Sequence, residues 1–283
     1  MNNQRGRLFG LFLIGMICFF AGNEAYSQQL LKIMISNDDG VDAPGIAALQ
    51  ERLSRMAAVT VVAPAKNQSG VGHGYTFVTP IVVRQTEKKG SRWFAVEGLP
   101  ATCVKLGLET LLEEKPDLVV SGINRGDNVG TMVFSSGTTA CAREAAYKGI
   151  PAVAFSLEAG GAMDYALAAD FAADLIAEVS TLKLPPGVFL NVNIPAFPKD
   201  KIKGVLVVGQ DKGAYPDYAY RKYSLEGSLQ IWYDFLPLNK EGLETDAGAL
   251  RSGYITITPF KVDATDEKTL ADLATLKLGS WKK

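Results

Sequence analysis

Two adjacent aspartates close the first apolar segment of the chain and are its clearest chemical feature. Asp38 and Asp39 follow the β-branched run 31–36 and precede Pro44-Gly45, which favours the start of a helix. In an α/β protein, ligands bind outside the carboxyl ends of the strands. Adjacent carboxylates repel each other and resist burial unless a cation neutralises them. The pair therefore predicts a site for a divalent metal ion.

Three further segments carry polar side chains to the same edge of such a sheet. They contain Ser69 in the stretch 63–70, Asn124 in the stretch 121–130, and the turn Ser136-Gly137-Thr138 at a helix start. Carboxylate, hydroxyl and amide oxygens suit a hard cation such as Mg²⁺, Mn²⁺ or Ca²⁺. A helix start with free N–H groups suits an anion. A metal site beside an anion site indicates chemistry on a phosphate ester, with Asp38 or Asp39 also able to act as base.

Several classes of enzyme are excluded by what the sequence lacks. His73 is the single histidine, which excludes metallohydrolases with several histidine ligands. No Gly-x-Ser-x-Gly motif is present, and the glycine spacings fit neither a dinucleotide fingerprint nor a P-loop. His73 follows Ser69 by four residues, so we interpret it as a hydrogen-bonding loop residue, with a supporting or substrate-facing role left open.

Strand-like and helix-like segments alternate through most of the chain. This pattern predicts a mostly parallel sheet with helices on both faces. The predicted strands are 31–36, 59–63, one ending at Val96, 117–121, 152–156 and 189–194, and the predicted helices are 44–56, 101–114, 138–148 and 163–181.

The texture changes after about Pro195. Residues 215–235 are aromatic and polar, and 228–235 alternate as a hairpin strand does. We expect a β-rich arm within about 210–240, followed by a short helix over 245–251, with Asp246 as its cap, and a final strand over 253–258. An arm with exposed apolar residues needs a cover, which favours a homodimer or homotetramer formed through it.

Composition and the N-terminus limit the partners and the location. The 283 residues have a formal net charge of −1, so the chain has no basic excess for a nucleic-acid polymer. Arg5 and Arg7 precede an apolar run, and Ala25-Tyr26-Ser27 is typical of a signal-peptidase site. We therefore expect a signal peptide over 1–27, one phosphatase domain over 28–283, export to the periplasm and no stable membrane association afterwards. The alternatives are an uncleaved anchor and a cytoplasmic protein.

The chain resembles the SurE family, the stationary-phase survival proteins that act as 5′/3′-nucleotidases. The matching stretches follow one another through nearly the whole mature chain and are 35–45, 63–70, 120–124, 136–138, 190–195, 245–246 and 253–259. The resemblance implies a Rossmann-like body and a C-terminal hairpin exchanged between subunits.

The resemblance also implies a ligand set for one divalent ion, most simply Mg²⁺ or Mn²⁺. Carried over to this sequence, the ligands are Asp38, Asp39, Ser69 and Asn124. The implied phosphate-facing residues are Asn37, Ser136, Gly137 and Thr138.

This sequence departs from the family pattern at Leu99, Thr102, Asp127 and Ser135, which leaves base preference and substrate range open. The expected activity is metal-dependent hydrolysis of nucleoside 5′/3′-monophosphates to nucleoside and phosphate. The alternatives are a broad acid phosphatase or exopolyphosphatase, and a non-catalytic exported binding protein for anionic ligands. Cys103 and Cys141 lie in apolar helical patterns, where a disulfide and two buried thiols are both open.

Overall fold

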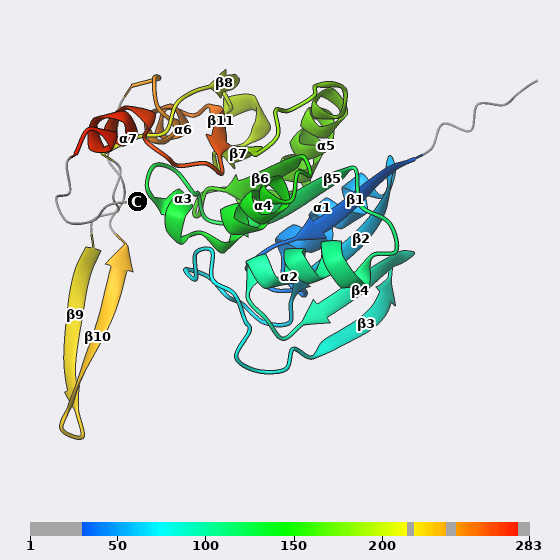
Figure 1. The fold of residues 1–283 in the computed structure, drawn as a ribbon, viewed down its shortest axis with the longest axis horizontal. Helices are drawn as coiled ribbons and strands as arrows, with labels where there is room; N and C mark the ends of the chain where they lie inside the picture. The colour runs from blue at the N-terminus through cyan, green and yellow to red at the C-terminus, as the bar shows by residue number, and fades with distance from the viewer. Residues whose placement is uncertain (1–29, 214–217, 236–241, 277–283) are drawn as a thin grey trace, which may run out of the picture.

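A nine-stranded sheet forms the centre of the protein (Figure 1). The computed structural model describes residues 30–213, 218–235 and 242–276. Along the sheet the strands are ordered β3-β4-β2-β1-β5-β6-β7-β11-β8, and neighbours run parallel except at β3–β4 and β7–β11. The strands are β1 Leu31–Ser36, β2 Ala57–Pro64, β3 Val83–Lys88, β4 Ser91–Val96, β5 Leu118–Arg125, β6 Ala152–Leu157, β7 Val188–Ile194, β8 Val205–Val207 and β11 Ile255–Lys261.

Helices cover both faces of this sheet, as the alternating pattern predicts. Helices α1 (Pro44–Leu53) and α5 (Tyr165–Thr181) pack on one face, where Ile46, Leu49 and Ile176 are fully buried. Helices α2 (Pro100–Leu106) and α4 (Gly137–Tyr147) pack on the other. The remaining helical segments are the π-helix η1 Gly107–Leu111, α3 Met132–Ser135, the 3-10 helix η2 Lys199–Lys201, α6 Asp246–Arg251 and α7 Glu267–Ala274.

The strand β5 continues past its predicted end at Ser121 and reaches Arg125. Its register with β6 shifts between Ser121 and Asn124, so the strand is irregular where the glycine lies. Gly122 has φ +130°, and a Cβ there would lie 2.4 Å from the carbonyl oxygen of Phe155. Only glycine fits this close approach. The irregularity places Asn124 at the carboxyl end of the strand.

Other boundaries differ for local reasons. Helix α1 ends at Leu53 rather than Met56, because Ser54–Met56 form a turn into β2. The helix predicted over 101–114 changes to the π-helix η1 after Leu106. Strand β3 is not predicted from the sequence. Its sequence, VRQTEK, is polar because β3 is an exposed antiparallel edge strand, so it lacks an apolar pattern.

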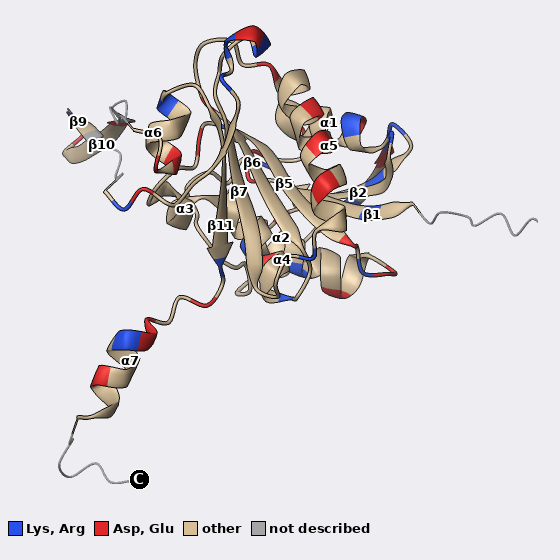
Figure 2. Ribbon diagram, turned by 90° about the horizontal axis from the view of Figure 1, so that it is seen from above, with Lys and Arg blue, Asp and Glu red and all other residues tan. Residues whose placement is uncertain are grey.

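A separate two-stranded hairpin projects from the body (Figure 1). It consists of β9 (Tyr218–Leu225) and β10 (Ser228–Phe235), which confirms the arm predicted within about 210–240. Trp232 is 62% exposed and Tyr233 is 64% exposed. Helix α7 also extends away from the body (Figure 2), and its Leu270 and Leu273 are exposed. Exchange of the hairpin between subunits stays a prediction.

The predicted signal peptide over 1–27 lies outside the described residues. Within the described part of the chain, no helix combines the length and apolar character needed to cross a bilayer. Cys103 and Cys141 are both buried free thiols, which resolves the question of a disulfide between them.

Candidate active site

The predicted site residues lie where the strand order reverses. The chain places β2 on one side of β1 and later places β5 on the other side, both parallel to β1. Ser36 is the register partner of Ser121, so Asp38 and Asp39 leave the sheet beside the end of β5 that carries Asn124. Ligands bind in α/β sheets at such a topological switch point. The structure thus brings the carboxylate pair and Asn124 to one edge.

Asp38 is a buried carboxyl group that points at the start of α4. It is 3% exposed, and Thr138 donates its hydroxyl to Oδ1 at 2.5 Å. Burial raises the pKa of Asp38 to about 6, although the Thr138 hydrogen bond lowers it and the charge of Asp39 raises it further. Because burial destabilises the ionised form of Asp38, a nearby positive charge would stabilise it.

The turn at residues 136–138 fits against Asp38. Ser136 caps α4 by accepting the N–H of Thr139 at 3.1 Å. A Cβ on Gly137 would lie 2.6 Å from the Cβ of Asp38 and 2.9 Å from its Oδ2. Because the glycine lets the helix start approach this closely, the positive end of the α4 dipole stabilises the carboxylate. The predicted phosphate-facing turn therefore adjoins the carboxylate pair.

Asp39 is more open to solvent than Asp38 and is held by a backbone N–H. Arg125 donates its N–H to Oδ2 at 3.0 Å, and the Asn67 side chain lies 3.5 Å from Oδ1. Burial raises the pKa of Asp39, while the N–H and the charge of Arg125 offset part of that rise. The contact fixes Asp39 relative to β5.

The other two predicted ligands lie on either side of the carboxylates. Asn124 donates its amide to the carbonyl of Gly126 at 2.7 Å, which leaves Oδ1 as the atom for a cation. Ser69 lies in the loop after β2 and is exposed. The preceding residue, Gln68, donates its N–H to the carbonyl of Asp38 at 2.7 Å. This bond brings the Ser69 loop to the carboxylate pair.

Asn37 and His73, like Ser136 and Thr138, form hydrogen bonds within the protein. Asn37 is fully buried, and its amide donates to the carbonyl of Gly40 at 2.9 Å and accepts its N–H at 3.2 Å. Asn37 thus shapes the loop that carries the two aspartates. His73 hydrogen-bonds to Glu144 at 3.0 Å and lies 3.4 Å from the hydroxyl of Tyr75.

Three buried asparagines that support the loop after β5 are not among the predicted site residues. Asn193 accepts the N–H of Asn128 at 2.7 Å, Asn191 donates to the carbonyl of Asn128 at 2.8 Å, and the amide of Asn128 donates to Ser156. These bonds hold the loop after β5. Their signal in the sequence is the run Asn191-Val-Asn193, whose asparagines are unusual in a buried strand.

Asp246 fastens the same loop to the base of the arm. The N–H groups of Gly130, Asp211 and Ala247 all donate to its carboxylate at 2.8–2.9 Å. The prediction that it caps a short helix is wrong by one position, because Thr245 is the N-cap of α6 and Asp246 is the first helical residue. Burial raises the pKa of Asp246, and these three hydrogen bonds offset part of that rise.

The residues that depart from the family pattern serve structural contacts. Thr102 accepts the N–H of Thr76 at 2.8 Å, and Thr76 in turn accepts the N–H of Leu99 at 3.1 Å. Asp127 forms an ion pair with Arg251 at 3.0 Å. None of these contacts involves the side chain of a proposed ligand.

The donor set at the switch point consists of two carboxylates and neutral oxygens. No group of three or more His, Cys, Asp or Glu side chains suited to a metal occurs within residues 30–213, 218–235 and 242–276. A site at Asp38 and Asp39 therefore depends on the neutral oxygens of Ser69 and Asn124. Two carboxylates with neutral oxygens fit a hard divalent cation such as Mg²⁺ and exclude a zinc-type site rich in nitrogen and sulfur.

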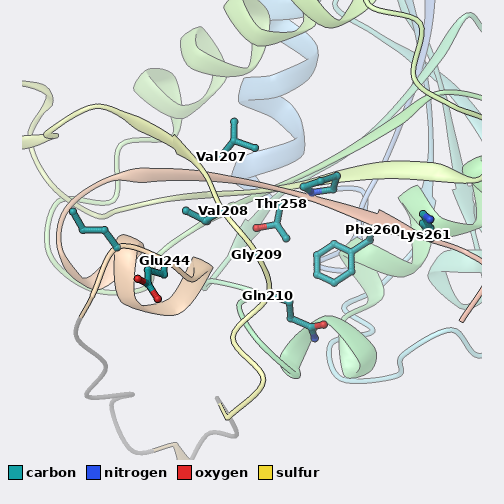
Figure 3. A pocket seen from close by; sticks show the side chains of 10 residues that line it. Val207, Val208, Gly209, Gln210, Glu244, Thr258, Phe260 and Lys261 are labelled. Carbon is teal, nitrogen blue, oxygen red and sulfur yellow. The ribbon is translucent and has the colours of Figure 1, made fainter. Parts of the chain in front are cut away.

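An open hollow of about 560 Å³ lies elsewhere, between β8, β11 and the segment before α6 (Figure 3). Its charged lining residues are Glu244 and Lys261, and none of the predicted ligands lines it. The hollow therefore does not coincide with the predicted site at the switch point.

A mostly parallel sheet with a carboxylate pair at its switch point defines an α/β protein that binds a ligand across the carboxyl ends of its strands. Residues 33–217 match the family model described as survival protein SurE. The relatives include the 5′-nucleotidase SurE of Geobacter metallireducens, 43% identical over 87% of this chain and 97% of that protein. Another is the 5′-nucleotidase SurE of Geotalea daltonii, 42% identical over 86% of this chain and 98% of that protein.

A solved structure agrees with these matches. The crystal structure of the SurE protein from Aquifex aeolicus superposes with a TM-score of 0.75 at 36% identity, covering 86% of this chain and 98% of the other. The chain belongs to the SurE family.

Proposed function

We propose that this protein is a metal-dependent phosphomonoesterase that hydrolyses nucleoside 5′- and 3′-monophosphates to nucleoside and phosphate. The observation that carries the proposal is the carboxylate pair Asp38-Asp39 at the switch point, with the start of α4 directed at Asp38. Relatives that align with most of the chain carry the name 5′-nucleotidase, which supports the substrate class.

The proposed ligands of the cation are Asp38, Asp39, Ser69 and Asn124, and we favour Mg²⁺ or Mn²⁺. When bound, such an ion lowers the pKa of a water molecule and neutralises negative charge on the phosphate. Ser136, Gly137 and Thr138 orient the phosphate from the start of α4. Asn37 contributes by holding the loop through Gly40.

Of the two aspartates, Asp39 is better placed to accept the proton of an attacking water. Its Oδ1 has one weak partner, Asn67 at 3.5 Å, whereas Asp38 is buried and holds the hydroxyl of Thr138. Asp38 then serves mainly to hold the cation. The guanidinium of Arg125, which follows Asn124 in β5, adds positive charge beside Asp39.

The experiment that tests the proposal is phosphate release from a panel of nucleoside monophosphates by the mature protein from Gln28. It is run with EDTA and then with Mg²⁺ or Mn²⁺ added back, beside short polyphosphate and p-nitrophenyl phosphate. Hydrolysis of nucleotides restored by metal supports the proposal. Preference for polyphosphate or the nitrophenyl ester would instead support a broad phosphatase, and binding without hydrolysis a binding protein.

We also propose that the protein assembles as a homodimer or homotetramer through the arm and that it is exported. The exposed Tyr220, Trp232 and Tyr233 support the first point, because such residues are usually covered by a partner. Light scattering on the wild type and on Trp232→Ser tests assembly. N-terminal sequencing of the secreted protein tests cleavage before Gln28.

A further inference from the structure

Glu144 is a buried carboxylate that contacts none of the proposed ligands. It lies in α4 and is 1% exposed. Its Oε2 accepts hydrogen bonds from His73, at 3.0 Å, and from the hydroxyl of Tyr75. Its Oε1 is buried and has no hydrogen-bond partner among the described residues. Burial acts to raise the pKa of Glu144, but the hydrogen bonds from His73 and Tyr75 outweigh it and lower the pKa.

A charge in such a place is costly to the fold. Burying a carboxylate with an unpaired oxygen costs stability unless its partners compensate. An uncharged residue at position 144 would avoid the cost of burying a charge. The cost therefore suggests that Glu144 serves a purpose other than stability.

The two donors to Glu144 belong to the loop that carries Ser69. This loop leaves β2 at Pro64 and reaches the site at Gln68, whose N–H bonds to the carbonyl of Asp38. It then turns back, where Gly72 donates its N–H to the carbonyl of Ser135 at 2.9 Å. His73 and Tyr75 follow directly and reach Glu144.

Ser69 is therefore held between two attachments. One joins Gln68 to Asp38, and the other joins 72–75 to α3 and α4. The second also ties the loop to the helix whose first residues, Ser136 to Thr138, lie against Asp38. The distance between Ser69 and the carboxylate pair thus depends on how firmly the loop is attached to α4.

We propose that Glu144 is a positioning residue for the metal site, holding the Ser69 loop to α4 through His73 and Tyr75. This inference rests on the proposed function, because it takes Ser69 as a ligand. His73 donates its Nε2–H to the carboxylate, and the acceptor on Glu144 needs both lone pairs of Oε2 for its two donors. Glutamine has the same shape but no charge, so its carbonyl oxygen would accept these two hydrogen bonds more weakly, and its NH₂ would be buried without an acceptor at the place of Oε1.

The experiment is calorimetric titration of Mn²⁺ into the metal-free full-length mature protein. The variants are Glu144→Gln, His73→Gln and Tyr75→Phe, and thermal unfolding is recorded for each. The control is Gln50→Met, which removes a buried polar group bonded to Ser54 and Ser91 far from the site. Gln50→Met should change thermal stability and leave the Kd for Mn²⁺ unchanged.

We expect Glu144→Gln to raise the Kd for Mn²⁺ about tenfold, the size typical of groups that orient metal ligands. His73→Gln and Tyr75→Phe should raise it by less, and Tyr75→Phe should have a smaller effect in the Glu144→Gln background than in the wild type. Nucleotide turnover by Glu144→Gln should approach that of the wild type when Mn²⁺ is saturating, because the ligands themselves are intact.

An unchanged Kd for Mn²⁺ in Glu144→Gln, with lower thermal stability like that of Gln50→Met, would overturn the proposal and leave Glu144 a purely structural residue. If Glu144→Gln does not fold, the double variant of His73→Gln and Tyr75→Phe decides alone, since both residues lie in a surface loop. A wild type that binds Mn²⁺ but hydrolyses no nucleotide contradicts the proposed function and not this inference. A wild type that binds no Mn²⁺ contradicts both.

Discussion

Gly137 lies against Asp38 with no room for a side chain, since a Cβ would be 2.6 Å from the Cβ of the aspartate. The contact joins the second residue of the Ser-Gly-Thr turn to the first residue of the carboxylate pair. The geometry of the site therefore requires a residue without a side chain at position 137.

Gly137→Ala should therefore disable the site by pushing α4 away from Asp38. We expect kcat/KM for nucleotides to fall more than about 100-fold, with a loss of about 1–3 kcal/mol of folding free energy from the clash. Gly209→Ala is the control, because a Cβ at Gly209 meets nothing within 4 Å. Kinetics and thermal unfolding of both variants check this, and near-wild-type activity of Gly137→Ala would contradict the close contact.

Asp39→Asn should abolish turnover with the fold retained. The asparagine oxygen can still accept the N–H of Arg125, but a neutral amide binds a divalent cation poorly. Activity should fall more than about 100-fold, beyond the effect of a residue that only supports a ligand. Asp42→Asn is the matched control, since Asp42 is an exposed aspartate of the same loop paired with Lys88. Nucleotide assays with and without EDTA decide, and full activity of Asp39→Asn would refute the metal assignment.

Asp38→Asn should stabilise the metal-free protein in a pH-dependent way. The pKa of Asp38 is raised from 3.8 to about 6 by burial, so the native state binds this proton more tightly than the unfolded state. The raised pKa therefore lowers the free energy of unfolding of the wild type by its full amount above about pH 6. This loss of stability disappears as the pH falls below about 4. We expect Asp38→Asn to gain on the order of 2–3 kcal/mol above pH 6 and nothing below pH 4.

Urea unfolding in EDTA across this pH range measures that difference. The Asp174→Asn variant, at an exposed position of α5, should show no such trend. A constant difference between Asp38→Asn and the wild type from pH 4 to 7 would show that the pKa of Asp38 is not raised.

Asp246→Asn should loosen the loop after β5. One carboxylate oxygen would become an NH₂ group, which would place a donor either against the N–H of Gly130 or against the N–H groups of Asp211 and Ala247. We expect a loss of about 1–3 kcal/mol of folding free energy and a rise in KM for nucleotides. Unfolding and steady-state kinetics, with Asp174→Asn again as control, measure both. An unchanged KM would mean that Gly130 does not influence substrate binding.

Strong local patterns make much of the fold predictable. β1 (Leu31–Ser36) and β10 (Ser228–Phe235) agree with their predicted bounds, because β1 is a short apolar run rich in isoleucine before a turn and β10 alternates with a period of two residues. The polar edge strand β3 and the last residues of β5 are not predictable, because pairing with β4 and the contact of Gly122 with Phe155 exist only in the folded chain.

The same limit applies to the candidate site. Side-chain types and their place at strand ends are enough to indicate Asp38, Asp39, Ser69 and Asn124. Nothing in the local pattern links His73 to Glu144, because those residues are 71 positions apart and meet only when the loop packs on α4. For Asn37, too, the sequence cannot show that both amide atoms are used by Gly40.

The pairing of β1 with β5 also has a kinetic consequence. Lys32 donates its N–H to Asp117, 85 residues further along the chain, and the carboxylate pair adjoins Asn124 only through this pairing. Contacts between such distant residues close large loops and slow folding. A chain that is still folding therefore lacks the proposed metal site until β5 has docked, so Mn²⁺ binding should appear late in refolding, after most of the helical signal has returned.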